Sequence, residues 1–395
     1  MRLIHLSDLH LGFRQYQRTT PAGINQREAD IGNVFRQTID KIIELAPDLV
    51  LIAGDIFHNV RPSNPAILHA FTQFSRLAQS LPNTIVVLLA GDHDTPRSAE
   101  TGCILRLFSP LGIEVADSRE RRLTFADRSL SVLAVPHLPG QRVAIEPDPA
   151  FEYNILAYHG ELQQHMPSWA DLERVENALD PKEIGYERWS YVALGHHHVF
   201  QHLASNACYS GSMEYASVNI WGELKEEVAA KVKGKKMVEY DLTTGKRTLH
   251  EIKPARLVVD LPPIRARALT SAEISAQMRT NVDQCKGGID DKIVRQLILD
   301  VPRHVVRELD HKALREYKRR AVHYHLDPRR PEIARATPSG VAGRRTSLAE
   351  TVRDKLWSRQ LQPDLDRDAL IELGLRYLRE ADQVETAALA VPESE

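Results

Sequence analysis

The sequence is poor in cysteine, in excess charge and in long apolar runs, and each shortage excludes a class of protein. Its three cysteines, Cys103, Cys208 and Cys285, lie far apart without a CxxC pair, which excludes a disulfide framework or a zinc knuckle. No apolar run is long enough to span a bilayer, and the polar motif at Asp8 leaves no room for a signal peptide. We therefore predict a cytoplasmic protein that does not enter a membrane.

The balance of residue types indicates a multidomain globular protein. The chain has 395 residues, which is too many for one ordinary core, so two or three domains are expected. Its net charge of −2 does not by itself indicate a nucleic-acid binder. The function must therefore be sought in local motifs rather than in overall composition.

Five short apolar runs in the first half of the chain share one design. Runs this short and this rich in Val, Ile and Leu are typical of buried strands. Helical patterns at Ile31–Leu45 and Pro65–Leu81 lie between some of them, which predicts an α/β layered sheet. The runs are Leu3–Leu6, Leu49–Ala53, Ile85–Ala90, Asn154–Tyr158 and Tyr191–Leu194.

Each of these runs leads into aspartate or histidine. Because ligands gather at the carboxyl ends of strands in open α/β sheets, we expect the five ends to converge on one site. This convergence is the strongest indication in the sequence. The motifs are Ser7-Asp8-Leu9-His10, Gly54-Asp55, Gly91-Asp92-His93-Asp94, His159-Gly160 and Gly195-His196-His197-His198.

The spacing of these residues suits a metal site. Asp8 and His10 are two positions apart at a strand end, so they face the same side, as do His196 and His198. Carboxylates combined with imidazoles suit Mn²⁺, Fe²⁺ or Zn²⁺. Taken alone, Asp55 is as consistent with an ordinary turn residue as with a ligand, so the prediction depends on the combination.

The pattern changes from about Leu257. Strand-like runs at Leu257–Leu261 and Lys292–Leu299 flank a helical stretch at Ser271–Val282, which predicts a small α+β unit. A Pro- and Gly-containing linker follows, and then two helical segments at Ser347–Gln360 and Arg367–Ala381. The tail from Glu385 is expected to be disordered.

The ordered set of motifs resembles the calcineurin-like metallophosphoesterase superfamily over about residues 1–240. Within it, His58 in Gly54-Asp55-Ile56-Phe57-His58, the motifs Asp290–Val294 and Leu309-Asp310-His311, and the final helix pair resemble the SbcD branch of DNA repair and recombination nucleases, which includes the Mre11 proteins. The resemblance covers nearly the whole chain. It is strong in the motifs and looser toward the end.

This resemblance implies a fold and a set of domains. The fold class is α/β, a four-layer α/β/β/α sandwich with a small α+β cap and a C-terminal helical pair. The domains are a phosphoesterase domain at 1–255, a cap that recognises DNA at 256–333, a linker at 334–346, a helix pair that binds an ATPase at 347–384 and a disordered tail at 385–395.

The resemblance also implies roles for the site residues. Asp8, His10 and His198 correspond to the ligands of one metal ion, and Asp92, His159 and His196 to those of a second. Asp55 corresponds to the bridging carboxylate, His93 to the catalytic histidine, and His58 to a second active-site histidine that positions the phosphate. Two cations about 3.5–4 Å apart can stabilise both the attacking and the leaving oxygen.

The resemblance further implies activity and partners. The activity is exonucleolytic and endonucleolytic cleavage of DNA with two divalent ions, Mn²⁺ being preferred. Members of the branch act as homodimers with an SMC-like ATPase of the SbcC and Rad50 type. The sequence contains no P-loop of its own, so an ATP-driven role requires such a partner. The helices at Pro65–Leu81 and Glu100–Leu111 are the candidates for the dimer contact.

One departure from the family pattern leaves alternatives open. The family motif is Gly-Asn-His-Asp, whereas this chain carries Asp92 in place of the amide. The extra charge is either a tolerated variation or the mark of a weakened nuclease. A weakened site would suit a rival function, that of a DNA-end-binding or scaffold subunit. A second rival, independent of Asp92, is a phosphoesterase acting on a phosphate outside nucleic acids.

Two charged segments also have open interpretations. The loop after His10 carries Arg14, Tyr16, Arg18 and Arg27, which either line a substrate groove or belong to an ordinary solvated loop. The basic segment Lys312–Arg320 either contacts phosphates or forms the solvated face of a helix.

Overall fold

A computed structural model describes residues 1–96, 98, 102–141, 143–163, 178–331, 348–357 and 366–388. The chain divides into two compact units, Met1–Pro331 and Glu332–Glu395. Within the described residues, no helix is long and apolar enough to cross a bilayer. The finer domain boundaries at 255, 333, 346 and 384 stay predictions.

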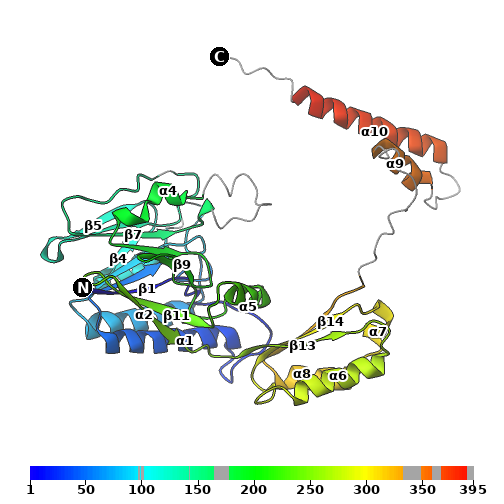
Figure 1. The fold of residues 1–395 in the computed structure, drawn as a ribbon, viewed down its shortest axis with the longest axis horizontal. Coiled ribbons are helices and arrows are strands. Elements are labelled where there is room, and N and C mark those ends of the chain that lie inside the picture. Colours follow the sequence, from blue (N-terminus) through cyan, green and yellow to red (C-terminus); the bar gives the residue numbers. More distant parts are fainter. Residues whose placement is uncertain are drawn as a thin grey trace. The chain divides into compact units, whose positions relative to one another are not determined.

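Two six-stranded sheets form the first part of the chain (Figure 1). The first sheet has the strand order β12-β11-β1-β2-β3-β4. The strands β1 to β4 are parallel to one another, and β11 is antiparallel to both of its neighbours, β1 and β12. Its strands are β1 (Arg2–Leu6), β2 (Leu49–Ala53), β3 (Ile85–Leu89), β4 (Glu114–Ala116), β11 (Lys235–Asp241) and β12 (Lys246–Ile252).

The second sheet has the order β5-β6-β7-β8-β10-β9. The strands β7 and β8 are parallel neighbours at its centre, so their carboxyl ends lie together. The strands are β5 (Arg121–Phe125), β6 (Leu130–Val135), β7 (Tyr153–His159), β8 (Tyr191–Gly195), β9 (Gln201–Ala204) and β10 (Ala207–Tyr209). The five predicted strands are therefore β1, β2 and β3 of one sheet and β7 and β8 of the other.

The two sheets pack face to face between helices. Alternate residues of β1 and β2, such as Leu3 and Leu49, pack against Ile155 and Ala193 of the second sheet in a buried core. The residues between them, such as Ile4 and Val50, point to the opposite face of the first sheet and pack against α1 (Gln26–Leu45) and α2 (Asn64–Ser80). The outer face of the second sheet packs against α4 (Pro181–Ile184) and its neighbouring loops. The predicted α/β/β/α sandwich is thus confirmed.

The ends of the two long helices have local causes. The side chain of Asn25 accepts hydrogen bonds from the first backbone amides of α1, and Ser63 does the same for α2, whose first turn also contains a proline. The helix α1 begins five residues before the predicted Ile31, because its first turn is polar and does not show the apolar period. The described residues of this part also form the 3-10 helices η2 (Ile104–Leu111), η3 (Ala126–Arg128) and η5 (Tyr186–Arg188).

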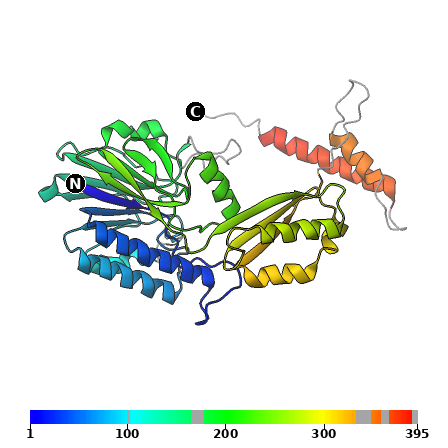
Figure 2. The same cartoon turned by 60° about the horizontal axis from the view of Figure 1, so that its bottom comes forward.

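The cap, residues 256–331, has a core of its own. Its three-stranded parallel sheet has the order β13-β14-β15, and α6 and α8 cover one face of it (Figures 1 and 2). The elements are β13 (Val258–Arg265), α6 (Ser271–Asp283), β14 (Ile293–Leu299), α7 (Arg303–Arg307), α8 (His311–Arg320) and β15 (His323–Pro328). A capping box between Thr270 and Glu273 begins α6.

The arginine-rich loop after His10 contacts the cap rather than forming a solvated surface. Arg18 donates to the carbonyl oxygens of Arg320 and Ala321, at 3.4 and 3.1 Å. The ring of Tyr16 stacks on His323 with 3.8 Å between centroids. Arg27 is fully buried and pairs with Asp30 and Glu214. Arg27 is too deeply buried to line a groove or to be solvated, so both interpretations were wrong for it. For Tyr16 and Arg18 the solvated loop was wrong, because a local pattern does not show contacts with distant residues, and a place in a substrate groove stays a prediction.

The basic segment Lys312–Arg320 forms helix α8. Two of its charges are used within the domain, since Arg319 pairs with Glu316 at 2.8 Å and Arg320 with Asp290 at 2.7 Å. The remaining cations of the segment stay a candidate for phosphate contact.

The described residues of the second unit form two helices that pack against each other, α9 (Leu348–Trp357) and α10 (Arg367–Ala388). A β-carbon at Gly374 would meet the side chain of Leu356, so glycine allows the helices to approach closely. The helix α10 is described as far as Ala388, and the disordered tail at 385–395 stays a prediction. Residues 358–360 and 389–395 lie outside the described residues.

Candidate metal centre

The predicted ligands come together in two groups at the carboxyl ends of the strands. Asp8, His10 and His198 form one triad, and Asp92, His159 and His196 form the other. In each triad, the potential ligand atoms all lie within 4.8 Å of one another. These are the same sets that the resemblance assigns to two metal ions. Their role as ligands stays a prediction.

The backbone is strained where the ligands leave their strands. Asp8, His10, Asp55 and His196 have positive φ angles of 54°, 46°, 52° and 110°. Side chains seldom adopt such angles unless surrounding contacts enforce them, and they concentrate at functional sites. Here the amide of Asp8 donates to the carbonyl of Gly54 at 3.0 Å, and that of His10 to the carbonyl of Asp55 at 2.9 Å. The two loops therefore hold each other in place.

Two glycines allow the strand ends to approach. A β-carbon at Gly91 would collide with the carboxylate and backbone of Asp55, and one at Gly195 would collide with the carbonyl oxygen of Ala53. In each case the colliding atoms include backbone atoms of β2 or of the loop that follows it, which cannot move aside as a flexible side chain can. The glycines in Gly-Asp-His-Asp and Gly-His-His-His are thus required by close packing at the centre.

Asp55 lies between the two triads. One of its carboxylate oxygens is 3.6 Å from Nε2 of His10, and the other is 3.6 Å from Nε2 of His159. The side chain is 2% exposed. Burial raises the pKa of Asp55 well above its ordinary range, although the facing His159 acts in the opposite direction. A carboxylate in this position can face two cations at once.

Hydrogen bonds orient the histidine rings toward the centre. Nδ1 of His159 lies 2.7 Å from the carbonyl oxygen of Ala53, and Nδ1 of His198 lies 3.1 Å from a carboxylate oxygen of Glu223. Because these oxygens can only accept, each Nδ1 donates, and Nε2 is the nitrogen of each ring that could bind an ion after giving up any proton it carries. In both rings Nε2 therefore faces the site as a potential ligand, an arrangement common for metal-binding histidines.

The charges of the centre also fit divalent cations. Asp8 and Asp55 are buried side by side, and burying like charges together is costly without a compensating cation. Nε2 of His10 and Nε2 of His198 face each other at 2.9 Å. Burial lowers the pKa of His10 well below its ordinary value, which keeps that ring neutral and able to ligate. The donor set of carboxylates and neutral imidazoles is one that Mn²⁺, Fe²⁺ and Zn²⁺ accept.

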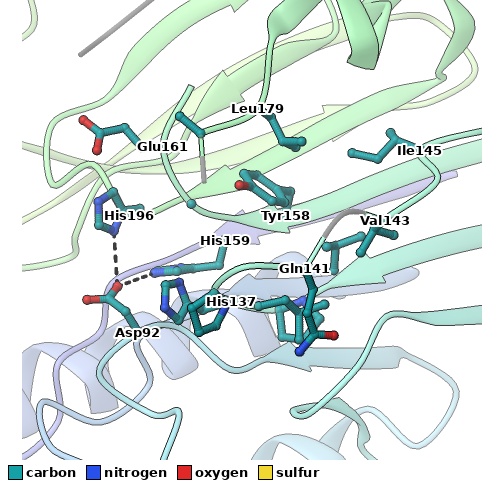
Figure 3. A pocket seen from close by; sticks show the side chains of 16 residues that line it. Asp92, His137, Gln141, Val143, Ile145, Tyr158, His159, Glu161, Leu179 and His196 are labelled. Carbon is teal, nitrogen blue, oxygen red and sulfur yellow. Dashed lines mark hydrogen bonds and ion pairs between the residues drawn. The ribbon is translucent and has the colours of Figure 1, made fainter. Parts of the chain in front are cut away.

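Asp92 sits where the second triad meets a cavity. One of its oxygens is 3.1 Å from Nε2 of His159 and 3.2 Å from Nδ1 of His196 (Figure 3). Burial would raise the pKa of Asp92, but these two hydrogen bonds prevail and hold it far below the ordinary range. For His159, burial acts against protonation, and the charges of Asp55 and Asp92 nevertheless raise the pKa to about 10. Asp92 is thus a firmly ionised carboxylate.

The cavity beside Asp92 has a volume of about 400 Å³. Figure 3 shows Asp92, His159 and His196 at one end, with Val143, Ile145 and Leu179 away from them. Polar side chains such as Gln141 and Glu161 also line it, and a space of this size is typical of a small-molecule subsite.

The two predicted active-site histidines lie together beside the first triad. Their rings stack with 5.0 Å between centroids, and Nδ1 of His93 lies 2.7 Å from the carbonyl oxygen of His58. Nδ1 of His93 must therefore donate, so Nε2, which is 3.8 Å from Asp92, is the nitrogen left to act on a substrate. Burial lowers the pKa of His58 to about 4, so that ring is neutral near pH 7.

Three side chains at the centre were missed by the sequence analysis. Asp94 is fully buried and accepts hydrogen bonds from the amides of Ile56, Phe57 and Gly91, at 2.9, 2.8 and 3.1 Å, so it joins two of the loops. Burial raises its pKa to about 6, although these bonds oppose the shift.

The other two are His137 and Glu223. His137 lines the cavity together with Asp92, and it also lines the opening beside His58 and His93. It follows the apolar strand β6, so the same strand-then-histidine signal could have found it. Glu223 lies on a helix 25 residues beyond His198, and no local motif connects the two.

The comparison with protein families assigns the first part of the chain to one class. Residues 1–229 match the model of the calcineurin-like phosphoesterases, which is more than half of the chain. The chain therefore belongs to the calcineurin-like phosphoesterase family.

Within that family, the chain is similar to archaeal proteins described as DNA double-strand break repair protein Mre11. It is 27% identical to that of Methanocaldococcus jannaschii over 238 residues, covering 58% of this chain and 60% of that protein. It is 38% identical to that of Methanococcus maripaludis over 102 residues, which cover 26% of this chain and 25% of that protein. It is 22% identical to that of Methanosarcina mazei over 361 residues, which cover 80% of this chain and 55% of that protein. The resemblance to the SbcD and Mre11 branch is confirmed, although the chain spans less than two thirds of these relatives.

Proposed function

We propose that this protein is a metal-dependent DNA nuclease that processes DNA ends by exonucleolytic and endonucleolytic cleavage, with Mn²⁺ as the preferred ion. The observation that carries the proposal is the pair of ligand triads around Asp55, with His93 and His58 beside them. The similarity to Mre11 proteins supports DNA as the substrate and a role in double-strand break repair, and we propose that the protein acts in the cytoplasm. Incubation of the pure protein with labelled linear DNA and Mn²⁺ tests it.

The residues divide the work of hydrolysis in a chemically consistent way. Asp8, His10 and His198 would hold one ion, Asp92, His159 and His196 a second, and Asp55 would face both. Bound divalent cations supply positive charge that stabilises the attacking and leaving oxygens of a phosphodiester. Because Nδ1 of His93 donates to the carbonyl of His58, Nε2 is the nitrogen that would meet the leaving oxygen, and it would give that oxygen a proton from the imidazolium form of the ring and regain one from solvent afterwards. His58, neutral near pH 7, contacts and positions the phosphate.

The replacement Asp92→Asn tests the departure from the family motif. An amide oxygen can still accept hydrogen bonds from His159 and His196, while one negative charge beside the phosphate is removed. We expect equal or higher nuclease activity, by up to about tenfold, which corresponds to a barrier change of ~1.4 kcal/mol. Steady-state cleavage of DNA with Mn²⁺ measures it. A large fall would instead show that the enzyme is tuned to the carboxylate, and DNA binding without cleavage in the unaltered protein would favour the scaffold function.

We further propose that the second unit binds an SMC-like ATPase of the SbcC and Rad50 type. Trp357 and Tyr377 are 63% and 61% exposed, and Leu373 is also exposed. Large apolar side chains left exposed on a pair of helices indicate a surface that another protein covers. The half-buried Val352 and Leu356 pack near Gly374 and hold the pair together. The exposed side chains are anchors of the kind that a helix-in-groove contact uses.

Removal of residues 347–395 should separate the two activities. Because Met1–Pro331 is a compact unit by itself, metal binding and Mn²⁺-dependent cleavage should persist within about twofold of the full chain. Co-purification with the ATPase should be lost. Capture of the ATPase at full strength by the shortened protein would place the main interface elsewhere.

We also propose that the protein is a homodimer through α2 and η2. The predicted apolar face of α2 is divided: Phe74 and Leu77 belong to the buried core, whereas Leu68 and Phe71 are exposed. Leu107 of η2 is exposed as well, and η2 packs against α2. Exposed apolar side chains on neighbouring helices suit a symmetric contact.

The replacement Leu68→Glu should convert this dimer into a monomer. A charge buried in the contact without a partner weakens association by about 2 kcal/mol or more, roughly thirtyfold in the dissociation constant. Sedimentation at micromolar concentration measures the mass. Leu249→Glu, at an exposed site on β12, is the matched control and should remain dimeric. A monomeric unaltered protein would refute the contact.

A further inference from the structure

Helix α5 (Ile220–Ala229) contacts both the metal centre and the cap. Glu223 on its buried side reaches the ligand His198, and Trp221, two residues earlier, reaches the cap. One short rigid element therefore joins a side chain of the centre to a separate core.

Glu223 is held as firmly as His198. One of its carboxylate oxygens accepts from Nδ1 of His198 and from the amide of Ser217, both at 3.1 Å, and the other accepts from Nζ of Lys235 at 2.6 Å. Lys235 also donates to the backbone carbonyl of His198 at 3.1 Å and to Ser212 at 3.0 Å. Glu223 and Lys235 are 4% and 2% exposed. The ring and the backbone of His198 are thus fixed by one buried ion pair.

Contacts with the cap fix the other side of the helix. The ring of Trp221 lies under the guanidinium of Arg295, 4.8 Å from the ring centroid, and stacks with His325 at 6.4 Å. Arg295 is itself held by a bidentate pair with Asp260. Ile220 of α5 is buried in a small apolar cluster with Ile293 and Val322 of the cap. These contacts set the position of the first turn of α5, which carries Glu223.

Lys235 reaches the same junction by a second route. Its ammonium lies 4.4 Å from the ring centroid of Tyr215, and Tyr215 packs in the apolar cluster with the cap residues Ile293 and Val322. Both members of the ion pair behind His198 therefore depend on groups that touch the cap.

We infer that Glu223 is a positioning residue for the ligand His198, and that α5 makes the affinity of the first triad for its ion depend on the docked cap. The inference rests on the proposed metal centre. A carboxylate that accepts from a metal-binding histidine fixes the ring orientation and its tautomer, and its loss usually weakens metal binding by about 10- to 100-fold. Displacement of the cap would release Trp221 and let Glu223 move.

Mn²⁺ titration by calorimetry tests the first half without DNA. Glu223→Gln should weaken binding at one of two sites by about 10- to 100-fold. Glu223→Asp serves as a second variant in case the amide variant is unstable. The aspartate keeps the negative charge beside Lys235, but its side chain is too short to reach both Lys235 and His198, so the same loss of Mn²⁺ affinity is expected. Glu251→Gln, the same carboxylate-to-amide change at an exposed position of β12, is the control and should keep the affinity. Unchanged affinity in both Glu223 variants would overturn the positioning role.

A double-mutant cycle tests the second half. Trp221→Ala should lower Mn²⁺ affinity by about fivefold or more, while Trp221→Phe, which keeps an aromatic ring, should retain it. The Trp221→Ala loss should largely vanish in the Glu223→Gln background, because both changes act on one contact. Additive losses, or no loss in Trp221→Ala, would overturn the dependence on the cap.

The unaltered protein separates this inference from the proposed function. If it binds no Mn²⁺, the metal centre itself is wrong. If it binds Mn²⁺ but does not cleave DNA, the nuclease function is wrong and the Glu223 and Trp221 effects on affinity still decide the inference.

Discussion

The replacement Asp55→Asn should abolish DNA cleavage, with a loss of about 10³-fold or more. The two oxygens of Asp55 face different triads, at 3.6 Å from Nε2 of His10 and 3.6 Å from Nε2 of His159. An amide offers one acceptor oxygen and no charge, so it cannot face two cations. Calorimetric titration with Mn²⁺ should accordingly show that at least one of the two binding events is lost.

The isosteric change keeps the shape of the side chain, so a folding defect is separable from a site defect. Asp40→Asn, on the exposed part of α1, is the matched control and should behave as the unaltered protein. Thermal unfolding in EDTA should differ little between the variants, because no ion is then bound in either. Retained nuclease activity in Asp55→Asn would count strongly against the bridging role.

His93→Ala should slow cleavage by about 10²- to 10⁴-fold while both metal ions stay bound. The backbone amide of His93 donates to Asp55 at 3.0 Å, and this contact survives the loss of the ring. The ring lies edge-on to His10 with 4.8 Å between centroids, its Nε2 is 3.8 Å from Asp92, and its side chain is 38% exposed, as a group that meets substrate must be. The defect should therefore appear in kcat rather than in Mn²⁺ affinity.

Single-turnover cleavage and Mn²⁺ titration together decide the role of His93. The exposed His304 on α7 provides a control, since His304→Ala removes an imidazole far from the centre and should change neither quantity. Loss of both metal ions in His93→Ala would show that the residue is a ligand instead. His58→Ala should give a smaller loss that varies with the DNA substrate, and an equal loss on every substrate would contradict its positioning role.

The parts of the fold that the sequence predicted are those encoded locally. Buried parallel strands such as Leu49–Ala53 must be apolar throughout, so they stand out, and the polar residue after each one must lie at its carboxyl end. The ligands were found for this reason. The pairing of strands between sheets was not encoded in this way, and β9 to β12 were not predicted because they are short or alternate weakly with exposed residues such as Leu249.

The parts of the site that the sequence could not predict depend on contacts between distant segments. Glu223 supports His198 from a helix that begins 22 residues later, and Arg18 reaches carbonyl oxygens about 300 residues away. Neither has a distinctive neighbourhood in the sequence. Asp94 was visible within Gly-Asp-His-Asp, but its three hydrogen bonds to backbone amides require the folded arrangement of both loops. Local motifs thus located the centre, whereas its supporting contacts required the structure.

The most direct test of the proposed function is cleavage of labelled linear DNA by the pure protein. The reaction would contain Mn²⁺ with or without EDTA, and Asp55→Asn would be run alongside as the site-specific control. We predict DNA fragments with Mn²⁺, none with EDTA, and none from Asp55→Asn. Cleavage that persists in EDTA or in Asp55→Asn, or metal-loaded protein that leaves the DNA intact, would contradict the assignment of this centre as a two-metal nuclease site.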